Sequence, residues 1–273
     1  MLFRSLGIPS MFCKCPVCEN ARKVKGKELR SRSGFILDEK VAIDFSADSY
    51  MNMVRNDVCF GSIKHLLVTH SHDDHFYPYD LAYRDSLARA SYPGIEKKLN
   101  IYGNSAVLKR LRDVEFFGEN VLATVNLIEI ARDQVFYMDD YKVTTFYAKH
   151  MFTEDSLVFL IERNGQAYLH LLDSPEPPKE FYDYLVKHEV KLDAVTADCT
   201  FGTMEEEFGG HMQMRQNTRV KGKLTELGIL KKNASYFLTH FSEYNGKDTH
   251  EILCEEAKKR NMIVAYDGFT AEF

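Results

Sequence analysis

Residues 70–75 read His70-Ser71-His72-Asp73-Asp74-His75, so three of the ten histidines in the 273-residue chain fall within six positions. They directly follow the apolar run 63–69, whose aliphatic and β-branched residues predict a buried strand that is too short for a helix. The histidines therefore lie on the loop that leaves this strand, where proteins often present functional side chains. Because side chains alternate along an extended chain, His70 and His72 project to the same side.

Imidazole and carboxylate groups together suit zinc, iron or manganese, so this loop is a candidate metal site. The chain turns after His72 and brings Asp74 and His75 to a neighbouring position, and one loop can thus serve two adjacent metal ions. The alternative is a solvated polar loop in which the histidines are incidental, but so dense a cluster is hard to obtain by chance.

The composition limits the class of protein. A chain of 273 residues that is 45% hydrophobic can bury a sizeable core, and no linker or repeat divides it, so we expect a single domain over residues 1–273. The net charge of −5 argues against nucleic acid as a partner, because that partner usually needs a basic face. No apolar run approaches a membrane span, and no signal peptide begins the chain. We expect a cytoplasmic protein with a small-molecule substrate and no membrane partner; a homodimer is compatible with the sequence.

Cys13, Cys15 and Cys18 form a C-x-C-x-x-C pattern near the start of the chain. Three thiolates in six residues match three corners of a tetrahedral zinc site, which favours a structural zinc. Reduced thiols or a redox pair are the alternative. The other three cysteines are scattered, as is typical of small buried apolar residues.

Asp44 ends the second strand of a predicted strand–turn–strand unit, 33–37 and 41–45. From there it could orient a metal-bound histidine. It could equally cap the helix that begins near Asp48. The sequence leaves both roles open.

The rest of the chain alternates predicted strands and helices, which indicates a mixed α and β fold. Potential ligands follow three of the strands, and these are His150, Asp173 and His240; the strand at 192–197 ends at Asp198. Strands are expected at 99–102, 125–130, 141–147, 157–162, 167–172, 192–197, 234–238 and 262–266. Helices are expected at 79–90, 105–114, 179–188, 211–227 and 249–259.

The pattern H-x-H-x-D-H resembles the signature of the metallo-β-lactamase superfamily at every defining position, and the resemblance runs from Gly7 to Gly268. It implies a four-layer αββα sandwich and a binuclear site in which two metal ions activate water as hydroxide. The implied first-metal ligands are His70, His72 and His150; the second-metal ligands are Asp74, His75 and His240; and Asp173 bridges both. Asp155 is the other candidate for the bridge, although it lies in a predicted turn.

The turn at Gly7 and the three cysteines narrow the resemblance to the metal-dependent hydrolases that include the cyclic phosphodiesterase of the carbon–phosphorus lyase pathway. There the structural zinc takes a histidine as fourth ligand, at the position of Glu243 here; His250 is another candidate. A histidine after a variable loop assists proton transfer in that group, so the resemblance makes His211 a general acid. The catalytic residues that we expect are Asp74 and His211.

The function that this resemblance implies is a metal-dependent phosphodiesterase acting on a small phosphate ester, cyclic or open. A lactonase or thioesterase of the same fold is the alternative within hydrolases. A metal-binding biosynthetic accessory protein without hydrolysis is the alternative from another class. The expected cofactors are two divalent ions, zinc or manganese or else iron, with a structural zinc at the cysteines.

Overall fold

The computed structural model describes residues 7–84, 96–115 and 117–273. The chain divides into two compact units, each with a sheet and an apolar core of its own. The larger unit comprises residues 1–31, 133–152 and 158–273, and the smaller unit comprises residues 32–132 and 153–157. The expectation of a single domain stays a prediction.

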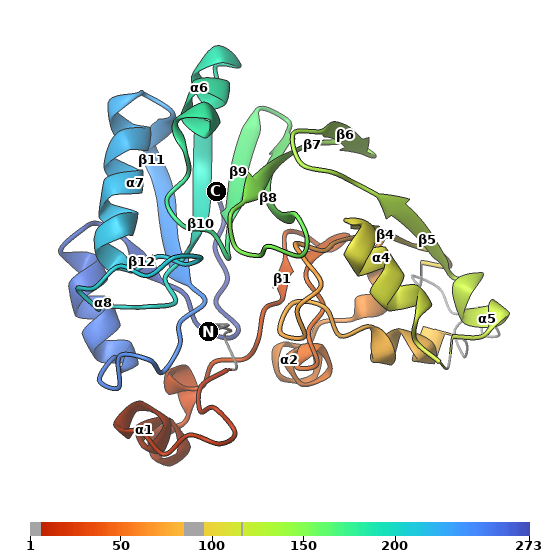
Figure 1. The fold of residues 1–273 in the computed structure, drawn as a ribbon, viewed down its shortest axis with the longest axis horizontal. Helices are drawn as coiled ribbons and strands as arrows, with labels where there is room; N and C mark the ends of the chain where they lie inside the picture. Colours follow the sequence, from red (N-terminus) through yellow and green to blue (C-terminus); the bar gives the residue numbers. More distant parts are fainter. Residues whose placement is uncertain (1–6, 85–95, 116) are drawn as a thin grey trace. The chain divides into compact units, whose positions relative to one another are not determined.

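The smaller unit is built on a five-stranded sheet in the order β1-β2-β3-β4-β5. Figure 1 labels β1, β4 and β5 of this sheet. Strands β2 to β5 run parallel to their neighbours, and β1 pairs with β2 in the antiparallel sense. Parallel neighbours end at the same edge of a sheet, so the residues that follow β2 and β3 come together. The strands are β1 Phe35–Ile36, β2 Val41–Ile43, β3 His65–Leu67, β4 Leu99–Gly103 and β5 Val125–Glu129.

Among its described residues, the smaller unit has the α-helices α2 Ser49–Asn56, α4 Ser105–Arg112 and α5 Glu119–Leu122. Helix α4 begins at Asn104, whose side-chain oxygen accepts a hydrogen bond from the Val107 N–H at 2.9 Å. Its apolar stripe of Val107, Leu108 and Leu111 is buried. The helix expected at 79–90 is a 3₁₀ turn over Pro78–Tyr83, and its residues 85–90 lie outside the described ranges.

The larger unit is built on a seven-stranded sheet in the order β12-β11-β10-β9-β8-β7-β6. Strands β9, β10, β11 and β12 run parallel to one another, whereas β8 and β9 form an antiparallel hairpin. Asn164 and Gly165 both take positive φ at the hairpin turn, which suits a tight two-residue connection. The strands are β6 Val135–Met138, β7 Tyr141–Ala148, β8 Ser156–Arg163, β9 Gln166–Leu171, β10 Leu192–Asp198, β11 Leu230–Thr239 and β12 Ile263–Val264.

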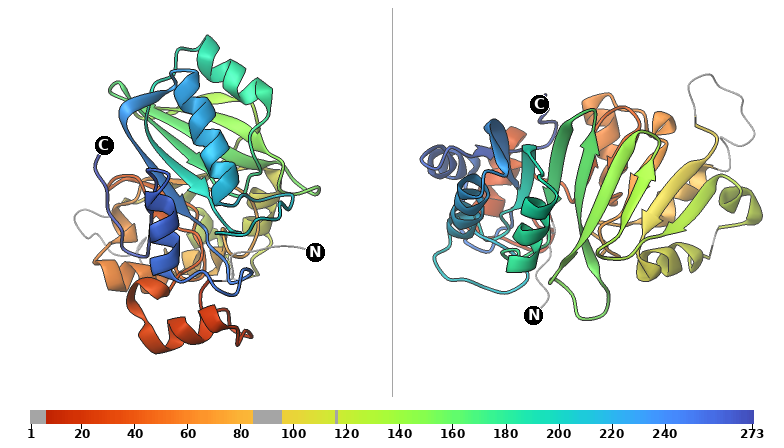
Figure 2. Two further views of the ribbon diagram at one scale, coloured as in Figure 1. Left: turned by 90° about the vertical axis from the view of Figure 1, so that its left-hand side faces the viewer. Right: turned by 90° about the horizontal axis from the view of Figure 1, so that it is seen from above.

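Helices α6 Lys179–Lys187, α7 Met214–Glu226 and α8 His250–Lys258 lie on one face of this sheet (Figure 2, left). Their buried apolar residues join the core of the larger unit, and so do Val17 and Ala21 of helix α1, Pro16–Val24. Within the described ranges, no helix is both long and apolar enough to cross a membrane.

Residues near the start of the described chain form hydrogen bonds with residues near its end. Ile8 and Arg30 exchange backbone hydrogen bonds of 2.8 Å in both directions. The Arg30 side chain donates to the carbonyl of Ala265 at 2.6 Å, and the Ser31 N–H donates to the Asp267 carboxylate at 2.8 Å. Segment 7–31 is therefore part of the larger unit, although residues 32–132 separate it from the remainder.

The mixed α/β architecture with two sheets confirms the predicted fold class. One predicted boundary is wrong in a way that matters for the site. The helix expected to start at His211 starts at Met214, after Gln213, whose backbone N–H donates a hydrogen bond to the Gln216 side chain at 3.0 Å. His211 therefore belongs to the connection before α7.

Candidate metal site

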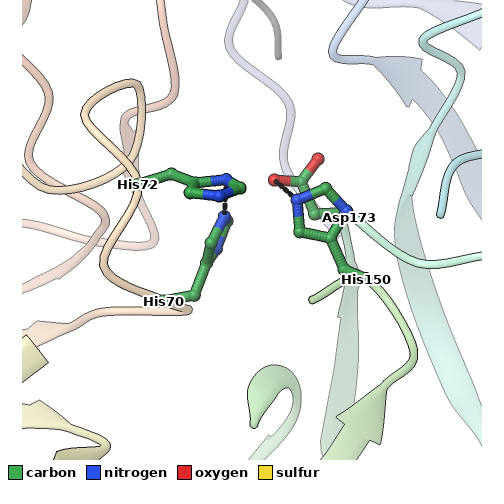
Figure 3. Close-up of side chains that lie close together, drawn as sticks. All are labelled: His70, His72, His150 and Asp173. Atoms are coloured by element: carbon green, nitrogen blue, oxygen red, sulfur yellow. Dashed lines mark hydrogen bonds and ion pairs between the residues drawn. The ribbon is translucent and has the colours of Figure 1, made fainter. Parts of the chain in front are cut away.

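The histidine loop in the smaller unit leaves the carboxyl end of β3 with its ligand candidates buried. His70, His72, Asp74 and His75 each expose 3% of their surface or less. The Nε2 of His70 lies 2.9 Å from the Nδ1 of His72, and Figure 3 shows this pair. Two imidazole nitrogens so close either share a proton or direct their lone pairs at one cation.

Asp44 orients this loop from the end of the neighbouring parallel strand. Its Oδ2 accepts from the Nδ1 of His75 at 2.6 Å, and its Oδ1 accepts from the N–H and the hydroxyl of Thr69, both at 2.9 Å. An ionised carboxylate only accepts hydrogen bonds, so His75 carries its proton on Nδ1 and offers Nε2 as a ligand. Of the two roles left open by the sequence, orienting a histidine is the one that the structure shows.

The Thr69 hydroxyl, which is itself oriented by Asp44, in turn orients His70. Its only proton goes to Asp44, so its oxygen accepts from the Nδ1 of His70 at 3.0 Å. The Nε2 of His70 is then the nitrogen that can bind a metal. Asp74 lies beside His75, with 3.8 Å between its Oδ2 and the Nε2 of His75.

The larger unit gathers a second set of ligand candidates at the carboxyl edge of its parallel strands. Asp173 follows β9, Asp198 ends β10 and His240 follows β11. The ligand atoms of Asp173, Asp198, His211 and His240 lie within 4.8 Å of one another. Asp173 and His240 have φ of 45° and 62°, a left-handed conformation that is uncommon outside glycine and recurs at functional sites.

Asp198 is the residue that arranges this second set. Its Oδ2 accepts from the Nδ1 of His211 at 2.8 Å and from the Thr200 hydroxyl at 3.0 Å. The Thr200 oxygen lies 2.8 Å from the Nδ1 of His240, which must therefore be the donor in that contact. The Nε2 of His240 then points to Asp173, at 3.2 Å from its Oδ1.

His150 follows β7 and is fixed in the same manner. Its Nδ1 lies 3.3 Å from the carbonyl of Gly210, which can only accept, and its Nε2 lies 3.7 Å from the Oδ2 of Asp173. Figure 3 shows this pair. Asp155, the other candidate for the bridging carboxylate, instead lies 3.5 Å from Arg132 and is half exposed.

His211 is buried, with its Nδ1 between the carboxylates of Asp198 and Asp173, at 2.8 and 3.2 Å. Burial lowers the pKa of His211, but the negative charges of Asp198 and Asp173 outweigh it and raise the pKa well above its usual value. Burial likewise raises the pKa of Asp198, and the two histidines overcome this and hold it below its usual range.

The three sulfurs of Cys13, Cys15 and Cys18 lie within 4.8 Å of one another in the larger unit. None of the six cysteines, all of which lie in the described ranges, forms a disulfide. Backbone N–H groups point at two of the sulfurs: that of Cys15 at Cys13, and that of Ser10 at Cys18, both at 3.4 Å. Such contacts suit thiolates that bind a metal.

The fourth ligand candidates of this cluster differ in their surroundings. The Nδ1 of His250 lies 2.9 Å from the Arg30 guanidinium, and its ring contacts the Cys254 sulfur at 3.5 Å. The charge of Glu243 acts on Cys13, where it opposes the hydrogen bonds from Cys15 that lower the pKa of the thiol.

Sequence reasoning missed Asp198, Thr200 and Thr69 as parts of the site. Asp198 carries the same signal as Asp173, an acid at the end of an apolar strand. The threonines carry no signal of their own, because their role arises only where two parallel strands bring an acid and a histidine to either side of the hydroxyl.

The side chains fit divalent metal ions by their chemistry. His70, His75, His150 and His240 each have Nδ1 bound to an oxygen, which is the usual arrangement of histidines that ligate through Nε2. Carboxylates accompany them in both units, and imidazole with carboxylate suits zinc, manganese or iron.

A family model described as the β-lactamase superfamily domain matches residues 52–241, more than half of the chain. The chain therefore belongs to this superfamily, whose members are mostly metal-dependent hydrolases. Its two-sheet fold matches the metallo-β-lactamase fold. No curated sequence matches the chain.

Solved structures share the fold along most of the chain. A diphosphatase from the PhnP family has a TM-score of 0.70 and 21% identity, over 99% of this chain and 94% of that chain. Zinc-bound PqqB from Methylobacterium extorquens has a TM-score of 0.70 and 18% identity, over 99% and 97%. Human tRNase Z, short form, has a TM-score of 0.62 and 17% identity, over 88% and 91%. At these identities the likeness shows the fold.

Proposed function

We propose that this protein is a metal-dependent phosphodiesterase that acts on a small phosphate ester, cyclic or open. The observation that carries the proposal is the buried His211, whose Nδ1 is bound to Asp198 beside the ligand candidates Asp173 and His240. An alkoxide is a poor leaving group near neutral pH, so cleavage of an alkyl ester benefits from a positioned acid. The PhnP-family diphosphatase of the same fold is consistent with phosphate chemistry.

His211 suits the role of general acid because Asp198 fixes the side of its ring. With Nδ1 held by the carboxylate, Nε2 is the atom that can donate a proton to a leaving oxygen, while the charge of Asp198 stabilises the imidazolium beforehand. Asp198 and Thr200 are positioning residues in this scheme, and Asp74 is a ligand whose charge helps to hold the metal.

We propose that the ligand candidates of the chain hold two divalent ions, as the resemblance to the metallo-β-lactamase superfamily implies. When bound, such ions lower the pKa of a water molecule and polarise the substrate oxygen. The first ion would take His70, His72 and His150, the second would take Asp74, His75 and His240, and Asp173 would bridge them.

We propose a structural zinc at Cys13, Cys15 and Cys18, supported by the short separations of their sulfurs and the N–H groups that face them. Glu243 is the better of the two candidates for the fourth ligand, because His250 contacts the cationic Arg30. Cytoplasmic location, a small-molecule substrate, the absence of nucleic-acid and membrane partners, and a homodimer stay predictions.

The test is a substrate panel with metal content measured alongside. Purified protein reconstituted with zinc or manganese is assayed on bis(p-nitrophenyl) phosphate, an aliphatic lactone and an acyl thioester. We expect turnover of the phosphodiester, and its loss when a chelator removes the metals.

The panel also separates the alternatives. Turnover of the lactone or the thioester alone would replace the proposal with that hydrolase activity. Metal-loaded protein that hydrolyses none of the three would favour a biosynthetic accessory role without hydrolysis.

A further inference from the structure

Ser71 lies between the ligand candidates His70 and His72, and side chains from outside the loop bind all of its polar groups. The Glu154 carboxylate accepts from the Ser71 N–H, at 3.1 and 3.2 Å to its two oxygens, and from the Ser71 hydroxyl at 2.5 Å. The Arg110 guanidinium donates to the Ser71 carbonyl at 2.6 Å. The residue between the two histidines is therefore held at its N–H, its hydroxyl and its carbonyl.

Glu154 and Arg110 are themselves fixed by helix α4. The Asn104 side-chain amide donates to Glu154 at 2.7 Å and to the Asp155 carbonyl at 2.8 Å, while its oxygen caps α4. Arg110 extends from the same helix and also pairs with Asp73. One end of α4 thus positions Glu154, and its middle supplies Arg110.

This arrangement complements the contacts of Asp44. Asp44 binds Thr69 and His75 and so fixes the two ends of the histidine loop. Glu154 and Arg110, which carry opposite charges, bind different polar groups of Ser71 within the loop. The direction in which His70 and His72 project depends on the backbone of the residue between them, and Glu154 fixes that backbone.

We propose that Glu154 is a positioning residue for the metal site, which acts through Ser71 to hold His70 and His72 in register for a shared ion. The proposal rests on the proposed function only in assuming that this loop binds a metal. Residues that orient ligands without touching the metal typically contribute about 10–100-fold to metal affinity. The charge of Glu154 strengthens its hydrogen bonds, which places it in that class.

The experiment is a titration of metal-free protein with Co²⁺, followed by the visible absorption of the bound ion. Glu154→Ala should raise the dissociation constant about 10–100-fold and change the absorption band at saturation. Asp155→Ala is the matched control, because that neighbouring acid faces Arg132. It should stay within about twofold of the wild type, on the scale of a half-exposed ion pair.

Glu154→Gln keeps the volume of the side chain and serves if Glu154→Ala does not fold. An amide cannot accept from Ser71 and Asn104 at every contact, so the Gln variant should show a smaller change in the same direction. Thermal unfolding of the metal-free variants separates positioning from stability. A Glu154 variant with a lowered melting temperature but an unchanged Co²⁺ band and affinity would overturn the proposal.

A double-mutant cycle tests the route through Ser71. Ser71→Ala removes the hydroxyl that donates to Glu154, so the two changes should not be additive in Co²⁺ affinity. Additive effects would show that Glu154 acts by another path and would overturn the proposal. Failure of the wild type to bind Co²⁺ would instead overturn the proposed function, and the two failures are thereby distinguished.

Discussion

The replacement of Asp44 by asparagine tests whether a single buried carboxylate sets the ligand nitrogen of His75. Asp44 is 1% exposed and accepts hydrogen bonds on both oxygens, Oδ1 from Thr69 and Oδ2 from His75 and Ser33. Asparagine has nearly the same shape but only one acceptor oxygen, so one side of it must present an NH₂ group.

Both orientations of the new amide carry a cost. If its NH₂ faces His75, the imidazole must accept on Nδ1 and carry its proton on Nε2, the nitrogen that would bind the metal. If its NH₂ faces Thr69, it meets the N–H that anchors the start of the loop. A buried donor left without an acceptor costs about 1–3 kcal/mol, which corresponds to about 5–150-fold in an equilibrium constant.

The two orientations place this cost in different measurements. The first weakens metal binding, and the second lowers the free energy of unfolding, so zinc or manganese affinity and chemical denaturation are measured on the same preparation. Asp48→Asn is the matched control for metal affinity, which it should leave unchanged, because Asp48 pairs with Arg32 outside the histidine loop. Unchanged affinity together with unchanged stability in Asp44→Asn would refute the assignment of the His75 proton to Asp44.

Three further outcomes are expected. His211→Ala should keep its metals but lose about 10²-fold or more in the rate of alkyl phosphodiester hydrolysis. The loss should be smaller with a nitrophenyl ester, because its leaving group needs little protonation. Equal losses on both esters would contradict the role of His211 as a general acid. Cys15→Ser should contain less zinc per chain by elemental analysis with the catalytic ions retained, and unchanged zinc would exclude a structural site at the cysteines. Asp48→Asn should lower the free energy of unfolding by about 1 kcal/mol or less at pH 7. Burial raises the pKa of Asp48, but the hydrogen bonds and charge of Arg32 outweigh this and lower the pKa. The contribution of the Asp48–Arg32 pair to stability is therefore complete above about pH 4 and is lost as pH falls through the pKa of Asp48 in the folded protein. A difference in the free energy of unfolding between variant and wild type that is the same at pH 7 and pH 3 would contradict this prediction.

Residues with local signals were predictable from the sequence. His70, His72, Asp74 and His75 stand together after an apolar run, and that run forms the buried strand β3. The strands that precede His150, Asp173 and His240 have bounds within a few residues of those expected. Elements with a strong period and a ligand at their end can be read without tertiary information.

Residues whose role depends on strand pairing were not predictable. Asp44 had two open roles, and the parallel pairing of β2 with β3 decides between them. In the sequence, Asp198 is only an acid at the end of a strand. In the structure, β9 and β11 flank β10, and this pairing brings His240 within reach of Asp198. The sequence predicted that His211 starts a helix, because the helical pattern runs on to it without a break. The helix instead starts at Met214, where the Gln216 side chain accepts from the Gln213 N–H.

The discontinuity of the larger unit has a consequence for the protein during its synthesis. Residues 32–132 hold all five strands of the smaller sheet, which can pair as soon as β5 leaves the ribosome. The segment with Cys13, Cys15 and Cys18 emerges earlier, yet its neighbour Ser31 is bound by Asp267. At about 5–20 residues per second, the chain between them takes about 12–50 s to make. During this time the thiols of Cys13, Cys15 and Cys18 lack the residues that surround them in the folded larger unit, so an oxidant would reach them most readily while the protein is being translated.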